Sequence, residues 1–149
     1  MRGVLFIVAI IVLTAVVSAN NTPVNFTVAF IGDQGLAPDQ PNSVLVLNLI
    51  KNESAEMVLH QGDFDYHDNP VSWDNQITGV LGPDFPYFAS PGNHDTSKWD
   101  SVAGYKQKLI ERLNRTPGAK CDGDYGVNSN CTYNGIFFIL SGVGTKGAG

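Results

Sequence analysis

Three short polar turns recur at equal spacing along this 149-residue chain. Asp33, Asp63 and Asn93 lie 30 residues apart, and each follows a glycine at the end of an apolar run. Each residue alone would be an ordinary turn residue. Together, two carboxylates and an amide oxygen are hard ligands for a cation, and the carboxylates would repel each other without one. Their common register therefore favours a cation site.

The histidines beside two of these turns are candidate acid–base groups. His94 follows the third turn's asparagine and is placed to donate a proton to a leaving oxygen, while Asp95 could hold its ring. A solvated turn histidine is the alternative for His94. His60 and His67 flank the second turn. We expect His60 to be a core or outer-sphere histidine and His67 to line the cleft.

Alternating strands and helices must bring the turns together. Strands are predicted over 25–31, 57–60 and 87–89, and each runs into one of the turns. Helices are predicted from the Pro38–Pro41 region to near Lys51, after Pro70 to about Leu81, and over 102–113, and a further buried strand over 135–140.

This order of elements predicts an α/β fold with a parallel or mixed sheet flanked by helices. Right-handed crossovers would place the turns at one edge of the sheet, beyond the carboxyl ends of the strands, where such folds bind ligands. The helix residues predicted to face the core are Val44, Leu45, Leu47, Leu49 and Ile50, then Trp73, Ile77, Val80 and Leu81, then Leu109, Ile110 and Leu113.

The local sequences around the turns resemble a known family. Gly32-Asp33-Gln34-Gly35, Gly62-Asp63-Phe64-Asp65-Tyr66 and Gly92-Asn93-His94-Asp95 resemble the first three signature blocks of the calcineurin-like metallophosphoesterases. A tyrosine three residues after the second aspartate is similar to the purple acid phosphatase branch. The resemblance implies that residues 20–149 form the N-terminal part of a metallophosphoesterase sandwich and that the enzyme hydrolyses phosphomonoesters.

The resemblance also implies a role for each matching residue. Asp33 would bind the first metal, Asp63 would bridge both, Asn93 would bind the second, and Tyr66 would be a further ligand to the first. The alternative for Tyr66 is an aromatic ring packed under the loop, because Asp65 beside it could compete. Two metal ions, iron with zinc, manganese or a second iron, would activate a hydroxide for attack on phosphorus. Oxygen ligands alone leave the metals' identity open.

The C-terminal part of the sequence departs from the family pattern. The family completes its metal site with a later isolated histidine and a Gly-His-x-His block, and all three histidines of this chain precede that part. We therefore expect an incomplete domain, with an exposed sheet edge and part of its apolar face uncovered. The resemblance predicts little or no phosphatase activity for the 149-residue chain alone.

Other functions remain open at this point. The same blocks occur in nucleotidases and sphingomyelin phosphodiesterases, so the phosphate ester substrate is not defined. A non-catalytic secreted module, binding one weak cation or none, is the alternative of another class, and the number of tightly bound metals separates the two. Residues 142–147 match Gly-x-Gly-x-x-Gly, but no helix or acidic residue follows, so we interpret them as a loop.

The N-terminal segment predicts secretion. A basic second residue precedes an apolar run from Val4 to Val17, which is shorter than the roughly 20 residues of a membrane span. Ser18-Ala19 fits the small-residue cleavage pattern, so we interpret residues 1–19 as a signal peptide. An uncleaved membrane anchor is the alternative. The mature chain would then lie outside the cell or in the endomembrane lumen, with no membrane contact after cleavage.

Composition agrees with one secreted domain. The net charge of −5 without a basic cluster argues against nucleic-acid or anionic-membrane partners. Cys121 and Cys131 are the only cysteines, and in an oxidising compartment they favour a disulfide, since a cysteine zinc site needs about four. Oligomeric state is not indicated. Five Asn-x-Ser/Thr sequons predict a glycoprotein, at Asn20, Asn25, Asn52, Asn114 and Asn130.

Overall fold

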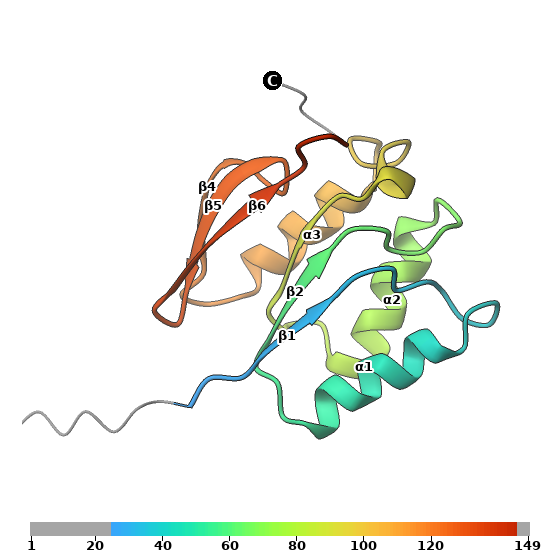
Figure 1. Ribbon diagram of the computed structural model, residues 1–149, viewed down its shortest axis with the longest axis horizontal. Helices are drawn as coiled ribbons and strands as arrows, with labels where there is room; N and C mark the ends of the chain where they lie inside the picture. The colour runs from blue at the N-terminus through green and yellow to red at the C-terminus, as the bar shows by residue number, and fades with distance from the viewer. Residues whose placement is uncertain (1–24, 146–149) are drawn as a thin grey trace, which may run out of the picture.

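The computed structural model describes residues 25–145 as two three-stranded sheets with three α-helices (Figure 1). The predicted signal peptide, the sequon at Asn20 and the end of the glycine-rich segment lie outside the described residues. Within residues 25–145, no helix has the length and apolar character needed to cross a membrane. The elements are β1 (Val28–Ile31), α1 (Asn42–Asn52), β2 (Met57–Gln61), α2 (Pro70–Leu81), β3 (Tyr87–Ser90), the 3₁₀ turn η1 (Asn93–Asp95), α3 (Tyr105–Asn114), β4 (Lys120–Asp124), β5 (Asn128–Tyr133) and β6 (Ile136–Ser141).

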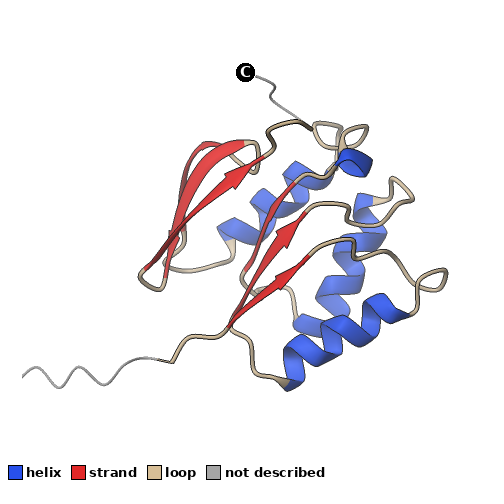
Figure 2. Ribbon diagram, viewed as in Figure 1, coloured by secondary structure: helices blue, strands red, loops and turns tan. Residues whose placement is uncertain are grey.

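The predicted parallel sheet is confirmed. Its strand order is β1-β2-β3 and both pairs are parallel. Successive side chains of a strand point to opposite faces. Tyr87 faces the helices, with its ring 5.8 Å from Trp73 of α2, and Phe88 faces the antiparallel sheet, 4.9 Å from Phe138 of β6. The parallel sheet therefore has helices on one face and the second sheet against the other (Figure 2).

Helix α1 buries fewer of its apolar residues than the sequence predicts. Ser43, Leu47 and Ile50 are buried. Leu45 and Leu49, which were predicted to face the core, are 64% and 57% exposed. The apolar run is wider than one helix face, so only residues three or four positions apart can point to the sheet together. The second helix is confirmed, with Trp73 and Ile77 fully buried.

Helix α3 starts later than predicted. It begins at Tyr105, after Gly104, and Val102 is 98% exposed. Leu109 is fully buried as predicted, whereas Ile110 is 36% exposed. The fully buried charged residue of this helix is Arg112, which faces α2.

The antiparallel sheet β4-β5-β6 is the part of the fold that the sequence missed. Only β6 was predicted, and it is only half buried, because Phe137 and Ile139 are 62% and 70% exposed while Phe138 and Leu140 point inward. The sequences of β4 and β5 are rich in Asp, Asn and Gly, which strands usually disfavour. The predicted disulfide is confirmed: Cys121 and Cys131 are directly paired across β4 and β5 and joined.

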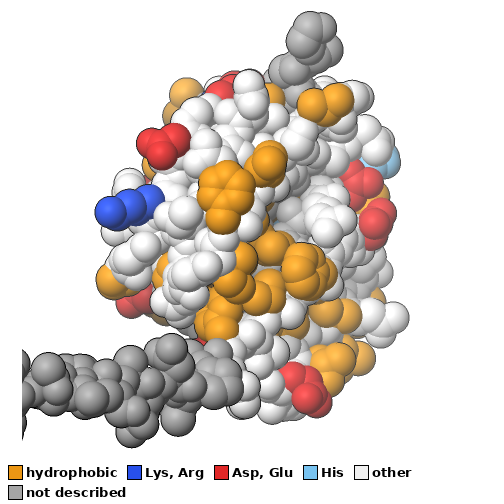
Figure 3. Space-filling view, turned by 60° about the vertical axis from the view of Figure 1, so that its left-hand side comes forward, with side chains coloured by type: hydrophobic (Ala, Val, Ile, Leu, Met, Phe, Trp, Pro, Cys, Tyr) orange, Lys and Arg blue, Asp and Glu red, His pale blue; other side chains and the backbone are white. Residues whose placement is uncertain are grey.

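Hydrophobic side chains also gather on the surface (Figure 3). Phe30, in the edge strand β1, is 65% exposed. It lies with Leu59 of β2 and Ile139 of β6 on the walls of a hollow of about 430 Å³ between the two sheets. Both an apolar surface and an exposed sheet edge were expected from the sequence.

Candidate metal centre

The three predicted turns lie side by side at one edge of the parallel sheet. Asp33, Asp63 and Asn93 follow the carboxyl ends of β1, β2 and β3, which are adjacent and parallel (Figure 1, upper right). Asp33 and Asn93 are exposed and Asp63 is partly buried. The first two turns are also joined directly, because the Asp33 N–H donates to the Gly62 carbonyl (3.1 Å). Residues 30 positions apart therefore meet at an open edge.

The second and third turns are held together by Asp95. Its buried carboxylate accepts hydrogen bonds from the backbone N–H groups of Asp63 (2.8 Å), Phe64 (2.9 Å) and Gly92 (2.7 Å). Burial raises the pKa of the Asp95 carboxyl to about 6, although these three hydrogen bonds act in the opposite direction. Asp95 was predicted to hold the ring of His94. Its oxygens are instead used to fix the backbone of two turns.

Glycine is required where these two turns touch. A Cβ atom on Gly62 would lie 2.4 Å from the Gly92 nitrogen, and one on Gly92 would lie 2.0 Å from Asp63 Oδ1. The second and third turns can therefore touch only because both positions are glycine. At Gly32 a Cβ would meet only the Gln61 carbonyl, at 3.9 Å, so the first turn does not need a glycine for space.

Both aspartates of the centre have unusual backbone angles. Asp33 has φ of 50° and Asp63 has φ of 57°. This left-handed region is sparsely populated by residues other than glycine and persists where the surroundings impose it. The two candidate ligands thus leave their strands in the same uncommon conformation, which contacts with the surrounding residues must maintain.

Tyr66 connects the first and second turns. Its O–H donates to Asp33 Oδ1 at 2.6 Å. Burial, this hydrogen bond and the negative charges of Asp33 and Asp63 raise the pKa of Tyr66 above its ordinary value. The alternative of a ring packed under the loop does not describe this geometry. Asp65 does not compete with Tyr66 as a metal ligand at this edge, because its side chain is buried. Its carboxylate accepts hydrogen bonds from the backbone N–H groups of His67 (2.8 Å) and Asn69 (2.9 Å).

His94 lies exposed beside this edge. Its backbone N–H donates to Asp63 Oδ1 (3.1 Å), and its ring lies 4.9 Å from the ring of Tyr66. The other two histidines are placed differently. His60 is 1% exposed, which confirms it as a core histidine. His67 is exposed, and its Nε2 atom lies 3.4 Å from Asp39 Oδ2.

The donors at this edge fit a hard cation through their chemistry. They comprise two carboxylates, one amide and one phenol, and the phenol oxygen already lies against a carboxylate. Within residues 25–145, no group of three or more His, Cys, Asp or Glu side chains is arranged to hold a metal ion. The residues that would hold one here are Asp33, Asp63, Tyr66 and Asn93.

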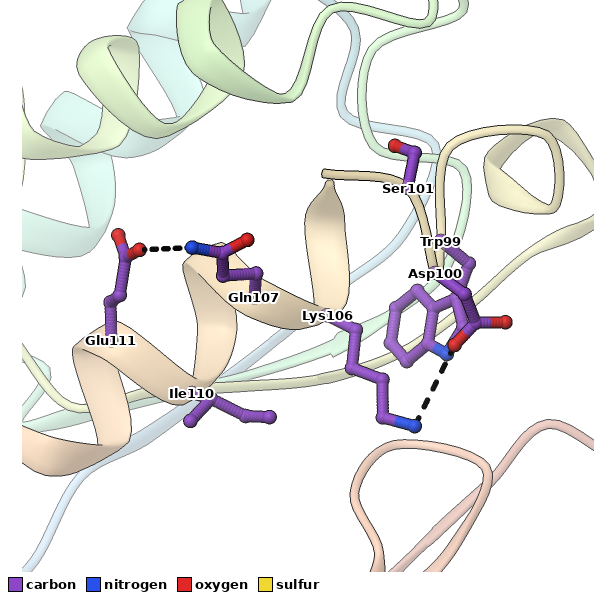
Figure 4. A pocket seen from close by; sticks show the side chains of 7 residues that line it. All are labelled: Trp99, Asp100, Ser101, Lys106, Gln107, Ile110 and Glu111. Atoms are coloured by element: carbon purple, nitrogen blue, oxygen red, sulfur yellow. Dashed lines mark hydrogen bonds and ion pairs between the residues drawn. The ribbon is translucent and has the colours of Figure 1, made fainter. Parts of the chain in front are cut away.

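A second hollow, of about 300 Å³, lies against α3 (Figure 4). Its lining includes Trp99 and an ion pair between Lys106 and Asp100 (3.6 Å). Gln107 and Glu111 are hydrogen-bonded to each other beside it (3.1 Å). This hollow shares no residue with the three turns, whereas a hollow of about 240 Å³ includes Asp33.

Comparison with known families agrees with the geometry of the edge. The family model of the calcineurin-like phosphoesterases matches residues 26–146. The chain belongs to this family, whose members bind metal ions and hydrolyse phosphoesters. No curated protein matches the chain. The matched range contains all three turns, both sheets and the disulfide.

Proposed function

We propose that this chain provides the carboxylate-rich part of the two-metal centre of a secreted phosphomonoesterase similar to the purple acid phosphatases. The observation that carries the proposal is the arrangement of three turns at one edge of the parallel sheet, beyond the carboxyl ends of β1, β2 and β3. Three signature turns meet there, and Asp95 ties two of them together through three backbone hydrogen bonds. An edge built only for stability would not need the carboxylates of Asp33 and Asp63 in neighbouring turns.

The proposed ligands are Asp33 and Tyr66 for one metal, Asn93 for the other, and Asp63 between them. The hydrogen bond between Tyr66 and Asp33 supports this assignment, since the two oxygens are already adjacent. Bound as a pair, iron with zinc, manganese or a second iron would activate water and neutralise the phosphoryl oxygens. Tyr66 would release its phenol proton on binding, which favours metal binding at higher pH.

His94 is the proposed proton donor to the leaving oxygen. Its side chain is exposed at the edge, and its backbone is anchored to Asp63 (3.1 Å). Asp95 acts as a positioning residue, because its carboxylate orients the turn from which His94 projects. A phosphate ester would approach from the open side, between the His94 ring and the two aspartates.

Secretion and glycosylation are part of the same proposal. The disulfide between Cys121 and Cys131 supports an oxidising compartment. The four sequon asparagines within the described residues are all exposed, so attached glycans would meet solvent; they are Asn25, Asn52, Asn114 and Asn130.

Mn²⁺ binding to the 149-residue chain tests the proposal. We compare wild type with Asp63→Asn and with Asp122→Asn, an exposed aspartate of β4 that serves as a matched control. Wild type and Asp122→Asn should bind with equal affinity, and Asp63→Asn should bind at least about 100-fold more weakly. Equal binding by all three proteins would contradict the proposal. One easily chelated ion that does not depend on Asp63 would identify a non-catalytic module.

The 149-residue chain should hydrolyse phosphate esters little or not at all, so a longer version of the same frame that supplies the family's histidine block is assayed. Its hydrolysis of p-nitrophenyl phosphate and of the bis-ester separates a monoesterase from a diesterase. Monoester turnover that disappears in Asp63→Asn supports the assignment. Turnover that persists in that variant would show that the ligand set is wrong.

A further inference from the structure

A chain of buried polar side chains lies beside the candidate metal centre. His60 Nδ1 of β2 is 2.6 Å from the hydroxyl of Tyr87 in β3, and that hydroxyl donates to Gln34 Oε1 at 2.8 Å. His60 and Tyr87 are each 1% exposed and Gln34 is 8% exposed. The three residues come from two strands and the first turn, and none of them is a proposed ligand.

The Tyr87 hydroxyl joins the other two side chains, because its oxygen lies within hydrogen-bond distance of both His60 Nδ1 and Gln34 Oε1. With Gln34 Oε1 as the acceptor of the hydroxyl proton, the Tyr87 oxygen accepts from His60 Nδ1; with the Gln34 amide turned, both hydrogen bonds run the other way, and the three side chains are joined in either case. Burial lowers the pKa of His60 to about 3, in agreement with a neutral ring. Phe64 holds the ring from the side, with centroids 4.8 Å apart.

This chain ends on the backbone that carries the proposed ligands. Gln34 follows Asp33 directly, and its backbone N–H donates to the Asp63 carbonyl (3.0 Å). Anchoring the Gln34 side chain inside the protein therefore restrains both turns from one point. Both aspartates have positive φ angles, a conformation that persists where other contacts impose it.

We propose that His60, Tyr87 and Gln34 form a positioning network that holds the turns of Asp33 and Asp63 in the geometry that a cation requires. The proposal rests on the proposed function of the edge. Outer hydrogen-bonding partners of metal ligands commonly change metal affinity by about 10- to 100-fold when they are removed. The competing explanation is a buried polar cluster that only stabilises the sheet.

Tyr87→Phe tests the network, because it removes one hydroxyl and keeps the buried ring. The matched control is Tyr125→Phe, since Tyr125 is also buried, at 5% exposed, but lies between β4 and β5 and is not part of this chain of side chains. Amide hydrogen exchange is measured without metal at Asp33 and Gln34, whose N–H groups join the two turns. In Tyr87→Phe, exchange at these two amides should accelerate about 10-fold more than exchange at the core amides of β2 and β3. In the control it should stay unchanged.

Mn²⁺ affinity provides the second measurement. It should fall about 10-fold in Tyr87→Phe and stay unchanged in Tyr125→Phe. A conservative change, His60→Asn, keeps a side chain that can form a hydrogen bond with Tyr87 and should retain most of the affinity, whereas His60→Leu should not.

Two results would overturn the network. One is exchange that rises uniformly over the parallel sheet in Tyr87→Phe, and the other is unchanged exchange at Asp33 and Gln34. Neither result depends on a bound metal. Failure of the proposed function is recognised separately, by Mn²⁺ binding in wild type that does not depend on Asp63.

Discussion

The two sheets bring their residues together in different ways. In the parallel sheet, paired residues such as Val28 and Met57 are separated by a whole helix, and every strand pair is long-range. In the antiparallel sheet, consecutive strands pair directly, and a disulfide crosses one of those pairs at Cys121 and Cys131. The candidate centre lies at the edge of the first sheet. Distant residues meet there because the crossovers return each strand to the same side.

This difference implies that the two sheets depend on different interactions. The geometry of the parallel sheet depends on helix packing and on buried polar contacts, such as the ion pair of Arg112 and Asp74. The antiparallel sheet has a covalent link. Weakening either set of interactions should therefore affect the two sheets, and the metal centre, to different extents.

The largest effect is expected from Arg112→Leu. The buried guanidinium of α3 donates to Asp74 Oδ1 (2.7 Å), the Asp74 carbonyl (2.9 Å) and Thr78 Oγ1 (2.6 Å) of α2. Removing it leaves the Asp74 carboxylate without its buried partner, which should lower the free energy of unfolding by about 3–5 kcal/mol. Urea unfolding, followed by tryptophan fluorescence, measures the change.

The control for this prediction is Arg115→Leu. Arg115 is exposed and lies 3.5 Å from the exposed Asp84, so its loss should cost less than about 1 kcal/mol. Equal losses in the two variants would show that the buried ion pair does not hold the helices of the parallel sheet.

A smaller effect is expected from removing the disulfide with Cys121→Ala and Cys131→Ala. The bond closes a loop with a sequence separation of 10, so its loss should lower the free energy of unfolding by about 2–3 kcal/mol. Thermal unfolding measures this loss. Mn²⁺ affinity should not change, because the centre belongs to the other sheet. Affinity that falls in proportion to stability would remove the distinction between the two sheets.

The smallest effect concerns pH and His60. Its folded pKa of about 3 lies below the unfolded value of 6.5, so the unfolded chain binds a proton first as pH falls. The neutral, buried His60 ring therefore contributes its full stabilisation of the folded state above pH 6.5, and this contribution is lost progressively towards pH 3. Between pH 6.5 and 5.5, the free energy of unfolding of the wild type should fall by about 1 kcal/mol more than that of His60→Asn.

Urea midpoints at the two pH values test this, with His67→Asn as an exposed-histidine control. An identical pH dependence in wild type and His60→Asn would mean that the buried ring does not resist protonation.

Several features could be predicted from the sequence because their causes are local or repeat at a fixed interval. The strands of the parallel sheet are short apolar runs that end in Gly-Asp or Gly-Asn, and helix α2 begins at a proline with an asparagine cap, whose side chain accepts from Ser72 (3.1 Å). The disulfide was predictable from the count of two cysteines together with the predicted secretion signal. The equal spacing of Asp33, Asp63 and Asn93 predicted their common edge.

Other features depend on contacts that no local pattern contains. Leu45 and Leu49 belong to an apolar run, but only the packing of α1 determines which of its residues face the sheet. The polar strands β4 and β5 form because their backbones pair and a disulfide joins them. Asp95 stands next to His94 in the sequence, yet its carboxylate binds N–H groups from a turn 31 and 32 residues away.

The sequence by itself determined which residues could bind a cation and that they follow strands of one parallel sheet, since residue type and spacing are properties of the chain. Only the tertiary structure decided how they are held: by the Asp95 carboxylate, by the contact of Gly62 with Gly92, and by the buried His60, Tyr87 and Gln34. Hydrogen bonds act over about 3 Å, so they exist only after folding has brought separate segments that close.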